Sequence, residues 1–231
     1  MRGKVLLYSY LILGFLEIIL TINEFDTYLV LHPVCVILIY SYHYKLTKSH
    51  NFYLLFFLAC ELVNEIFFLL DFRFYFELVL FCYSLATFTM IYHLWPLWNR
   101  PAGKLELDIL MGPILGIVGM LIIFWELLLM IFEKIPNYPV FFLGLLALLS
   151  WILFCTTTPI KNNHPLSSTM YLLGGLMAIM APTMFIYSFL FEHSSILALC
   201  LLSMLILKWI IAVFLTRKDK ILKTVDEFLE N

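Results

Sequence analysis

The sequence predicts an all-α integral membrane protein, a polytopic bundle of eight transmembrane helices with both termini in the cytoplasm. Of its 231 residues, 63% are hydrophobic and only 13% are charged. The apolar residues form long uninterrupted blocks, and the positive charges concentrate in every second gap between these blocks. A soluble domain carries about 25% charged residues and shows the alternation of a surface helix or strand.

A helix that crosses a bilayer needs about 20 mainly apolar residues. The first block follows a basic start without a small-residue cleavage site, so we interpret it as a retained helix and not as a signal peptide. Residues 52–97 are too long for one crossing and require a tight turn at Asp71–Arg73. Charged breaks and breaks rich in Pro and Asn delimit the expected helices: 4–22, 28–44, 52–70, 75–97, 109–132, 138–157, 169–191 and 195–216.

Lysine and arginine collect on the cytoplasmic side of membrane proteins. With the N-terminus inside, 11 of the 14 Lys and Arg residues fall in cytoplasmic segments, and only Arg73 and Lys134 fall outside. We therefore expect one transmembrane domain over residues 1–216. Residues 217–231 repeat apolar side chains on one helical face, which predicts an amphipathic tail on the inner membrane surface or, alternatively, a partner-binding helix.

Several function classes have no signal in this chain. The near-neutral charge and the lack of a basic cluster interleaved with aromatics argue against nucleic-acid binding. We find no phosphate-binding glycine loop and no zinc-type spacing, so we expect no cofactor and no metal. The five cysteines lie inside separate apolar blocks and are interpreted as buried packing thiols.

Ionisable groups inside the membrane are the candidate site residues, because each costs about 2.5–3.5 kcal/mol on insertion scales. Glu77 and His93 lie near helix ends, where their side chains can reach the interface. The other candidates are Glu17, Glu61, Asn64, Glu65, Glu126 and Lys208. The alternative is that they act as hydrogen-bonding contacts between helices.

Depth along the helices suggests how these groups pair. Glu61 is about 14 Å and Lys208 about 12 Å from the inner ends of their helices, so we expect an ion pair between them. Glu17, Glu65 and Glu126 fall in the outer halves and are expected to line a polar cavity open to the outside. Glu61 and Glu65 share a helix face, so we expect at least one of them to be protonated near neutral pH.

Eight helices, a tight turn after the third and the stretch "ELVNEIFFLL" in helix 3 resemble the YhhN family of lysoplasmalogenase-like membrane proteins. The resemblance places Asn64 and Glu65 at the Gly-Asp of the family motif, and Tyr92 at its helix 4 tyrosine. This chain departs from the family at Thr89, where a histidine is expected. In "GGLMAIMAPTMF" the second acid is missing, and Lys208 occupies the position of a glutamine.

The resemblance implies hydrolysis of the vinyl-ether bond of a lysoplasmalogen, or a relative that has lost this catalysis. Glu65 would then be the neutral acid that protonates the vinyl ether, and Glu126 or Glu17 would replace the missing second acid that directs water. A more general hydrolase or lyase of amphiphilic lipids would use Glu65 and Glu61 as its acid–base pair. The alternative is a non-enzymatic sensor, transporter or assembly subunit that uses the same acids for a proton or ligand. The expected partners are membrane lipid and an amphiphilic small molecule, and the expected location is a bacterial inner membrane.

Overall fold

The computed structural model of this protein describes residues 2–23, 28–98, 107–162 and 167–229, and this part of the chain is helical without a strand. Eight of its helices are long and apolar enough to cross a membrane, which confirms the predicted multi-pass membrane protein. They are α1 (Arg2–Ile22), α2 (Tyr28–Thr47), α3 (Phe52–Asp71), α4 (Phe76–Trp98), α5 (Leu107–Ile131), α6 (Tyr138–Asn162), α7 (Ser167–Phe185) and α8 (Ser194–Leu229). A 3₁₀ turn η1 (Phe132–Lys134) follows α5, and a π-helical turn η2 (Ile186–Leu190) follows α7.

Helix is the expected state for these blocks because lipid offers no hydrogen-bond partner to exposed peptide groups. The helix ends use local polar residues. Asn51 precedes α3, and its side-chain oxygen accepts a hydrogen bond of 3.0 Å from the Leu54 amide. Such a cap satisfies one of the free amides of the first turn, and it begins α3 at Phe52.

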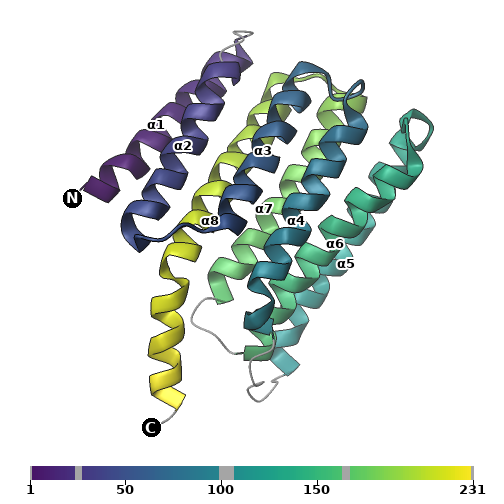
Figure 1. The fold of residues 1–231 in the computed structure, drawn as a ribbon. Coiled ribbons are helices and arrows are strands. Elements are labelled where there is room, and N and C mark those ends of the chain that lie inside the picture. Colours follow the sequence, from purple (N-terminus) through teal and green to yellow (C-terminus); the bar gives the residue numbers. More distant parts are fainter. Residues whose placement is uncertain (1, 24–27, 99–106, 163–166, 230–231) are drawn as a thin grey trace.

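Seven of the helices close into a ring. Neighbours along the ring are α1, α2, α3, α4, α6, α7 and α8, and α8 returns to contact both α1 and α2. α5 lies outside this ring, mainly against α6, and Figure 1 shows it at the edge of the bundle farthest from α1 and α2. The side chains at the centre of the ring therefore come from helices far apart in the sequence.

The predicted tight turn joins α3 to α4. The Asp71 carboxylate accepts hydrogen bonds from the amides of Arg73 (3.0 Å) and Phe74 (3.1 Å), which closes the turn. Next to it, Arg73 Nε donates to the Ser188 carbonyl in η2 at 2.8 Å. Edge-to-face aromatic contacts of Phe72 with Phe185 and Phe189 pack the turn against the end of α7. We call this end of the bundle distal, because α1 begins and α8 ends at the other end (Figure 1).

The expected C-terminal tail is continuous with the last helix. α8 runs for 36 residues, from Ser194 to Leu229, and only Ser194–Arg217 forms its membrane span. Residues 217–229 are thus helical, in agreement with the periodicity of their apolar residues. Their position on a membrane surface, and the cytoplasmic location of both termini, remain predictions.

Close packing of α1 on α8 depends on a glycine. A Cβ added at Gly14 would lie 2.2 Å from Leu205 Cδ1, whereas one added at Gly119 in α5 would meet nothing within 4 Å. Leu205 is buried, and its carbonyl accepts a 2.7 Å hydrogen bond from the Tyr10 hydroxyl. The α1–α8 contact therefore has little room to adjust.

We predict that Gly14→Ala destabilises the bundle and that the matched Gly119→Ala does not. Forcing a methyl group against Leu205 should cost about 1–3 kcal/mol, while alanine in an open helical position gains about 0.5–1 kcal/mol in propensity. Thermal unfolding of the purified variants in detergent measures the difference. Equal midpoints for the two variants would contradict the proposed packing of α1 on α8.

Candidate functional site

Four ionisable side chains from four helices meet inside the ring. Glu17 projects from α1, His32 from α2, Glu65 from α3 and Lys208 from α8, and we call them the ion cluster. Their exposed fractions are 5%, 6%, 0% and 2%, respectively. A buried charge is tolerated when it is paired and hydrogen-bonded, and the contacts within the cluster supply such partners.

Lys208 and Glu65 form the central ion pair of this cluster. Lys208 Nζ donates to Glu65 Oε1 at 2.7 Å and to Glu65 Oε2 at 2.5 Å, and it lies 3.0 Å from His32 Nε2. His32 bridges the two acids, because its Nδ1 contacts Glu17 Oε1 and its Nε2 contacts Glu65 Oε2. The result is a continuous chain of polar contacts from α1 through α2 to α3 and α8.

The cluster has two electrically neutral forms. With Glu65 ionised and Lys208 protonated, neutrality requires either a protonated His32 beside an ionised Glu17, or a neutral His32 beside a protonated Glu17. These forms differ only in the position of one proton between His32 Nδ1 and Glu17 Oε1, two atoms in direct contact. The arrangement can therefore hold and move a proton without creating net charge in the membrane.

The expected Glu61–Lys208 pair is wrong, since Lys208 binds Glu65 instead. The Cα–Cβ bonds of a helix tilt toward its N-terminus. α8 begins at the distal end, so the Lys208 side chain extends distally, whereas the α3 glutamates extend the other way. The Lys208 ammonium therefore reaches the carboxylate of Glu65, one turn distal of Glu61. Counting residues along each helix compares the depths of the backbone positions and does not include this side-chain tilt.

Two further candidates lie away from the cluster. Glu126 is exposed on α5, which is outside the ring, so it does not line a cavity with Glu17 and Glu65. Tyr92 is 70% exposed on α4, with its ring 6.1 Å from that of Tyr53. Its side chain does not reach the ion cluster. Tyr92, which the resemblance made a candidate, is therefore not part of that site.

His32 is the residue that the sequence analysis missed. Counted from the distal helix ends, His32 is about 6 Å, Glu17 about 7.5 Å and Glu65 about 9 Å deep at 1.5 Å per residue. Comparison of depths over all ionisable residues, histidines included, would have grouped these three. Within the described ranges, no set of three or more His, Cys, Asp and Glu side chains has the geometry to hold a metal ion.

The remaining candidates, Glu61 and Asn64, are buried on the same face of α3 but are not part of the ion cluster. One oxygen of Glu61 and both polar atoms of the Asn64 side chain have no hydrogen-bond partner within the described part of the chain. The two glutamates of α3 are therefore in different environments, one ion-paired and one not.

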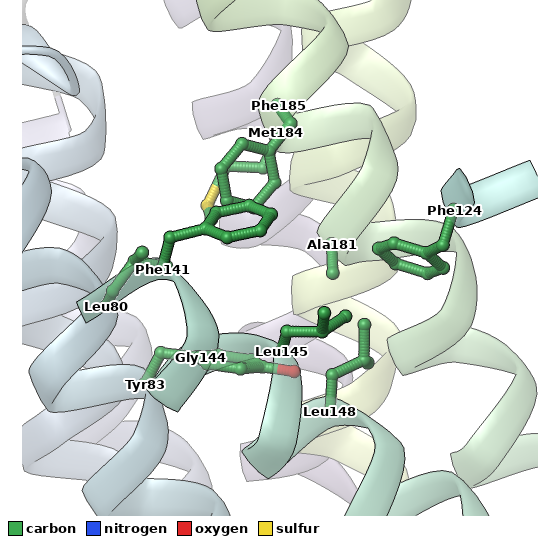
Figure 2. Close-up of a pocket in the computed structure, with 10 residues that line it drawn as sticks. All are labelled: Leu80, Tyr83, Phe124, Phe141, Gly144, Leu145, Leu148, Ala181, Met184 and Phe185. Atoms are coloured by element: carbon green, nitrogen blue, oxygen red, sulfur yellow. The ribbon is translucent and has the colours of Figure 1, made fainter. Parts of the chain in front are cut away.

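Two hollows lie near these residues without touching the ion cluster. The larger, about 340 Å³, is at the distal end between the α3–α4 turn and η2, and its lining includes Phe68, Arg73, Tyr187 and Glu192. The smaller, about 20 Å³, lies between α4, α5, α6 and α7 with mostly apolar walls (Figure 2). The ion cluster itself is closed by packed side chains.

Comparisons with protein-family models, with curated proteins and with solved structures found no match to this chain. The geometry of the buried polar side chains is therefore the basis for inferring a function.

We predict that Lys208→Met strongly destabilises the protein and that Glu65→Gln restores much of the loss in the double variant. Removing only the lysine leaves a buried carboxylate without its cation, which costs about 3–5 kcal/mol. Replacing both charges removes this penalty. A double-mutant cycle on unfolding in detergent measures the coupling between the two residues.

The matched control for this cycle is Lys208→Met combined with Glu61→Gln. Because Glu61 does not contact Lys208, this pair should recover no stability. Recovery with Glu61→Gln equal to that with Glu65→Gln would refute the pairing described above.

Proposed function

We propose that this protein binds and releases protons within the membrane at the ion cluster, and that it is a proton-linked sensor or transporter. The observation that carries the proposal is the His32 imidazole held between the Glu17 and Glu65 carboxyl groups. Histidine changes its charge within the physiological pH range, and ionisable chains of this kind inside membranes mark proton relays.

The closed environment of the cluster favours proton binding over the binding of a larger ligand. Its four residues are at most 6% exposed, and neither hollow is lined by them. A proton needs only a chain of hydrogen bonds or single waters, whereas a lipid requires a cleft that buries much of its surface. The host membrane is proposed to be a bacterial inner membrane, because the composition favours an AT-rich bacterial genome.

We predict that the His32 ring changes its protonation or tautomer with pH and that this change depends on Glu17. Isotope-labelled histidine in vesicle-reconstituted protein reports both states by magnetic resonance, with His32→Gln identifying the signal. Glu17→Gln removes the proton-sharing acid and should alter the titration, whereas the exposed Glu126→Gln should leave it unchanged. A His32 signal that stays constant across the stable pH range would overturn the proposal.

Proton flux separates the two roles within this class. In vesicles carrying a pH gradient, flux that is lost in Glu65→Gln supports a transporter. A titrating His32 without flux supports a sensor.

A second candidate function is hydrolysis of an amphiphilic ether lipid of the lysoplasmalogen type. The observation that favours it is the different environment of the two α3 glutamates: Glu65 is paired with Lys208, while Glu61 has no cation contact. Glu65 is thus held as a carboxylate suited to direct water, and Glu61 is suited to remain neutral and donate a proton, which is the division of roles that paired acids use. The large distal hollow lies beside Phe68, three residues from Glu65, and offers a place for a polar headgroup.

We predict for this candidate that the purified protein releases an aldehyde from a lysoplasmalogen, and that Glu65→Gln and Glu61→Gln each abolish the release. Mass spectrometry of lysoplasmalogen and lysophospholipid panels measures the products. Glu126→Gln makes the same chemical change at an exposed position and should retain turnover. No product from folded, monodisperse protein would remove this candidate and leave the proton-linked one standing.

A further inference from the structure

A second group of buried polar side chains lies between α3 and α4. Glu61 and Asn64 project from one face of α3, and Tyr83 and Thr87 from one face of α4; all four are buried. Since α3 and α4 are antiparallel neighbours joined by a tight turn, positions 61 and 64 lie opposite positions 83–87. Asn64 lies close enough to interact with Glu61, and Thr87 with Tyr83, but neither pair has the geometry of a formed hydrogen bond.

These side chains contain most of the unpaired buried polar atoms in the described part of the protein. Seven such atoms occur there, and five of them belong to this group: Glu61 Oε1, Asn64 Oδ1, Asn64 Nδ2, Tyr83 Oη and Thr87 Oγ1. A buried polar atom without a partner costs about 1–3 kcal/mol. Five in one place point to an additional molecule that completes their hydrogen bonds.

The chemistry of the five atoms indicates what that molecule is. The amide nitrogen of Asn64 can only donate, the carbonyl oxygen of Asn64 can only accept, and the two hydroxyl groups can do both. A cation would satisfy the oxygens but not the amide nitrogen. Water both donates and accepts, and sites with two to four polar partners are those that hold buried water.

The charges around Glu61 decide its state. Six titratable groups interact electrostatically with Glu61: Glu65 and Cys60 on α3, Tyr83 and Cys82 on α4, and Lys208 and Cys200 on α8. Lys208 is the only cation among them, and it is already bound to both oxygens of Glu65. An ionised Glu61 would be a second carboxylate one turn from Glu65 without a cation of its own.

We propose that Glu61, Asn64, Tyr83 and Thr87 form a hydrated proton-storage site, which binds ordered water and holds Glu61 in its neutral, protonated form. The site is separate from the ion cluster but lies one helical turn from it along α3. Its proposed role rests on the proton-linked function above. Protonated Glu61 would store a proton close to the ion cluster, whose groups exchange protons.

Tyr83 connects this site to the smaller cavity. It is the one residue with a polar side chain among the ten that line the cavity, and Figure 2 shows its ring extending past Gly144 toward Leu148. About 20 Å³ is room for one water molecule. The Tyr83 hydroxyl thus borders a water-sized cavity and also interacts electrostatically with Glu61 on α3.

Infrared spectroscopy of the vesicle-reconstituted protein tests this proposal through the carbonyl stretch of a protonated carboxylic acid. We expect this band at neutral pH, the loss of its Glu61 component in Glu61→Gln, and its shift in deuterium oxide because the site exchanges with water. Tyr83→Phe and Thr87→Val preserve shape and should each move the band to higher frequency, since a less hydrogen-bonded acid absorbs there. These two variants keep the test valid if Glu61→Gln does not fold.

Three outcomes would overturn the proposal. The first is the absence of a protonated-acid band at neutral pH, or a band that is unchanged in Glu61→Gln. The second is its loss in Glu126→Gln, which would assign it to the exposed acid on α5. The third is its removal when sodium replaces choline at equal ionic strength, which would identify a cation site. The test reads the Glu61 carbonyl and not His32, so its failure is distinguishable from failure of the proton-linked function.

Discussion

The ion pair between Glu65 and Lys208 joins α3 to α8 across the centre of the ring, and both oxygens of the carboxylate contact the ammonium. In a membrane interior these two charges would be costly if either stood alone, so the pair couples the positions of two helices that are 143 residues apart. His32 and Glu17 extend this coupling to α2 and α1. The interactions of one carboxylate thus connect four of the helices that close the ring.

The pair also divides the acids of α3 between two states. Because Glu65 binds Lys208, the one lysine that is buried in the described part of the chain, Glu61 has no cation of its own. A neutral carboxyl group among hydroxyl and amide partners is consistent with its position. Two acids on one helix face thereby acquire different chemistry from their surroundings alone, which is how proteins assign donor and acceptor roles to identical residue types.

The packing around these groups is suited to holding protons and excluding bulk water. The ring helices bury the polar side chains, and aromatic side chains of the α3–α4 turn and the end of α7 pack against one another beside the large distal hollow. A closed, low-dielectric interior strengthens every electrostatic contact within it. Glu65 is common to both proposed functions: it contacts His32 in the proton-linked one, and it is the carboxylate that directs water in the hydrolytic one.

The sequence alone determined the membrane class, the eight helices and the tight turn at Asp71, because the length and hydrophobicity of a span are constrained by the bilayer. It also identified Glu17, Glu61, Glu65 and Lys208 as exceptional, since ionisable residues are rare in lipid. Only the tertiary structure decided that Lys208 binds Glu65, that His32 joins the cluster and that Glu126 and Tyr92 lie outside it. The depth of a residue in a helix can be counted along the sequence. The direction of its side chain, and the helix that this side chain contacts, depend on how the ring closes.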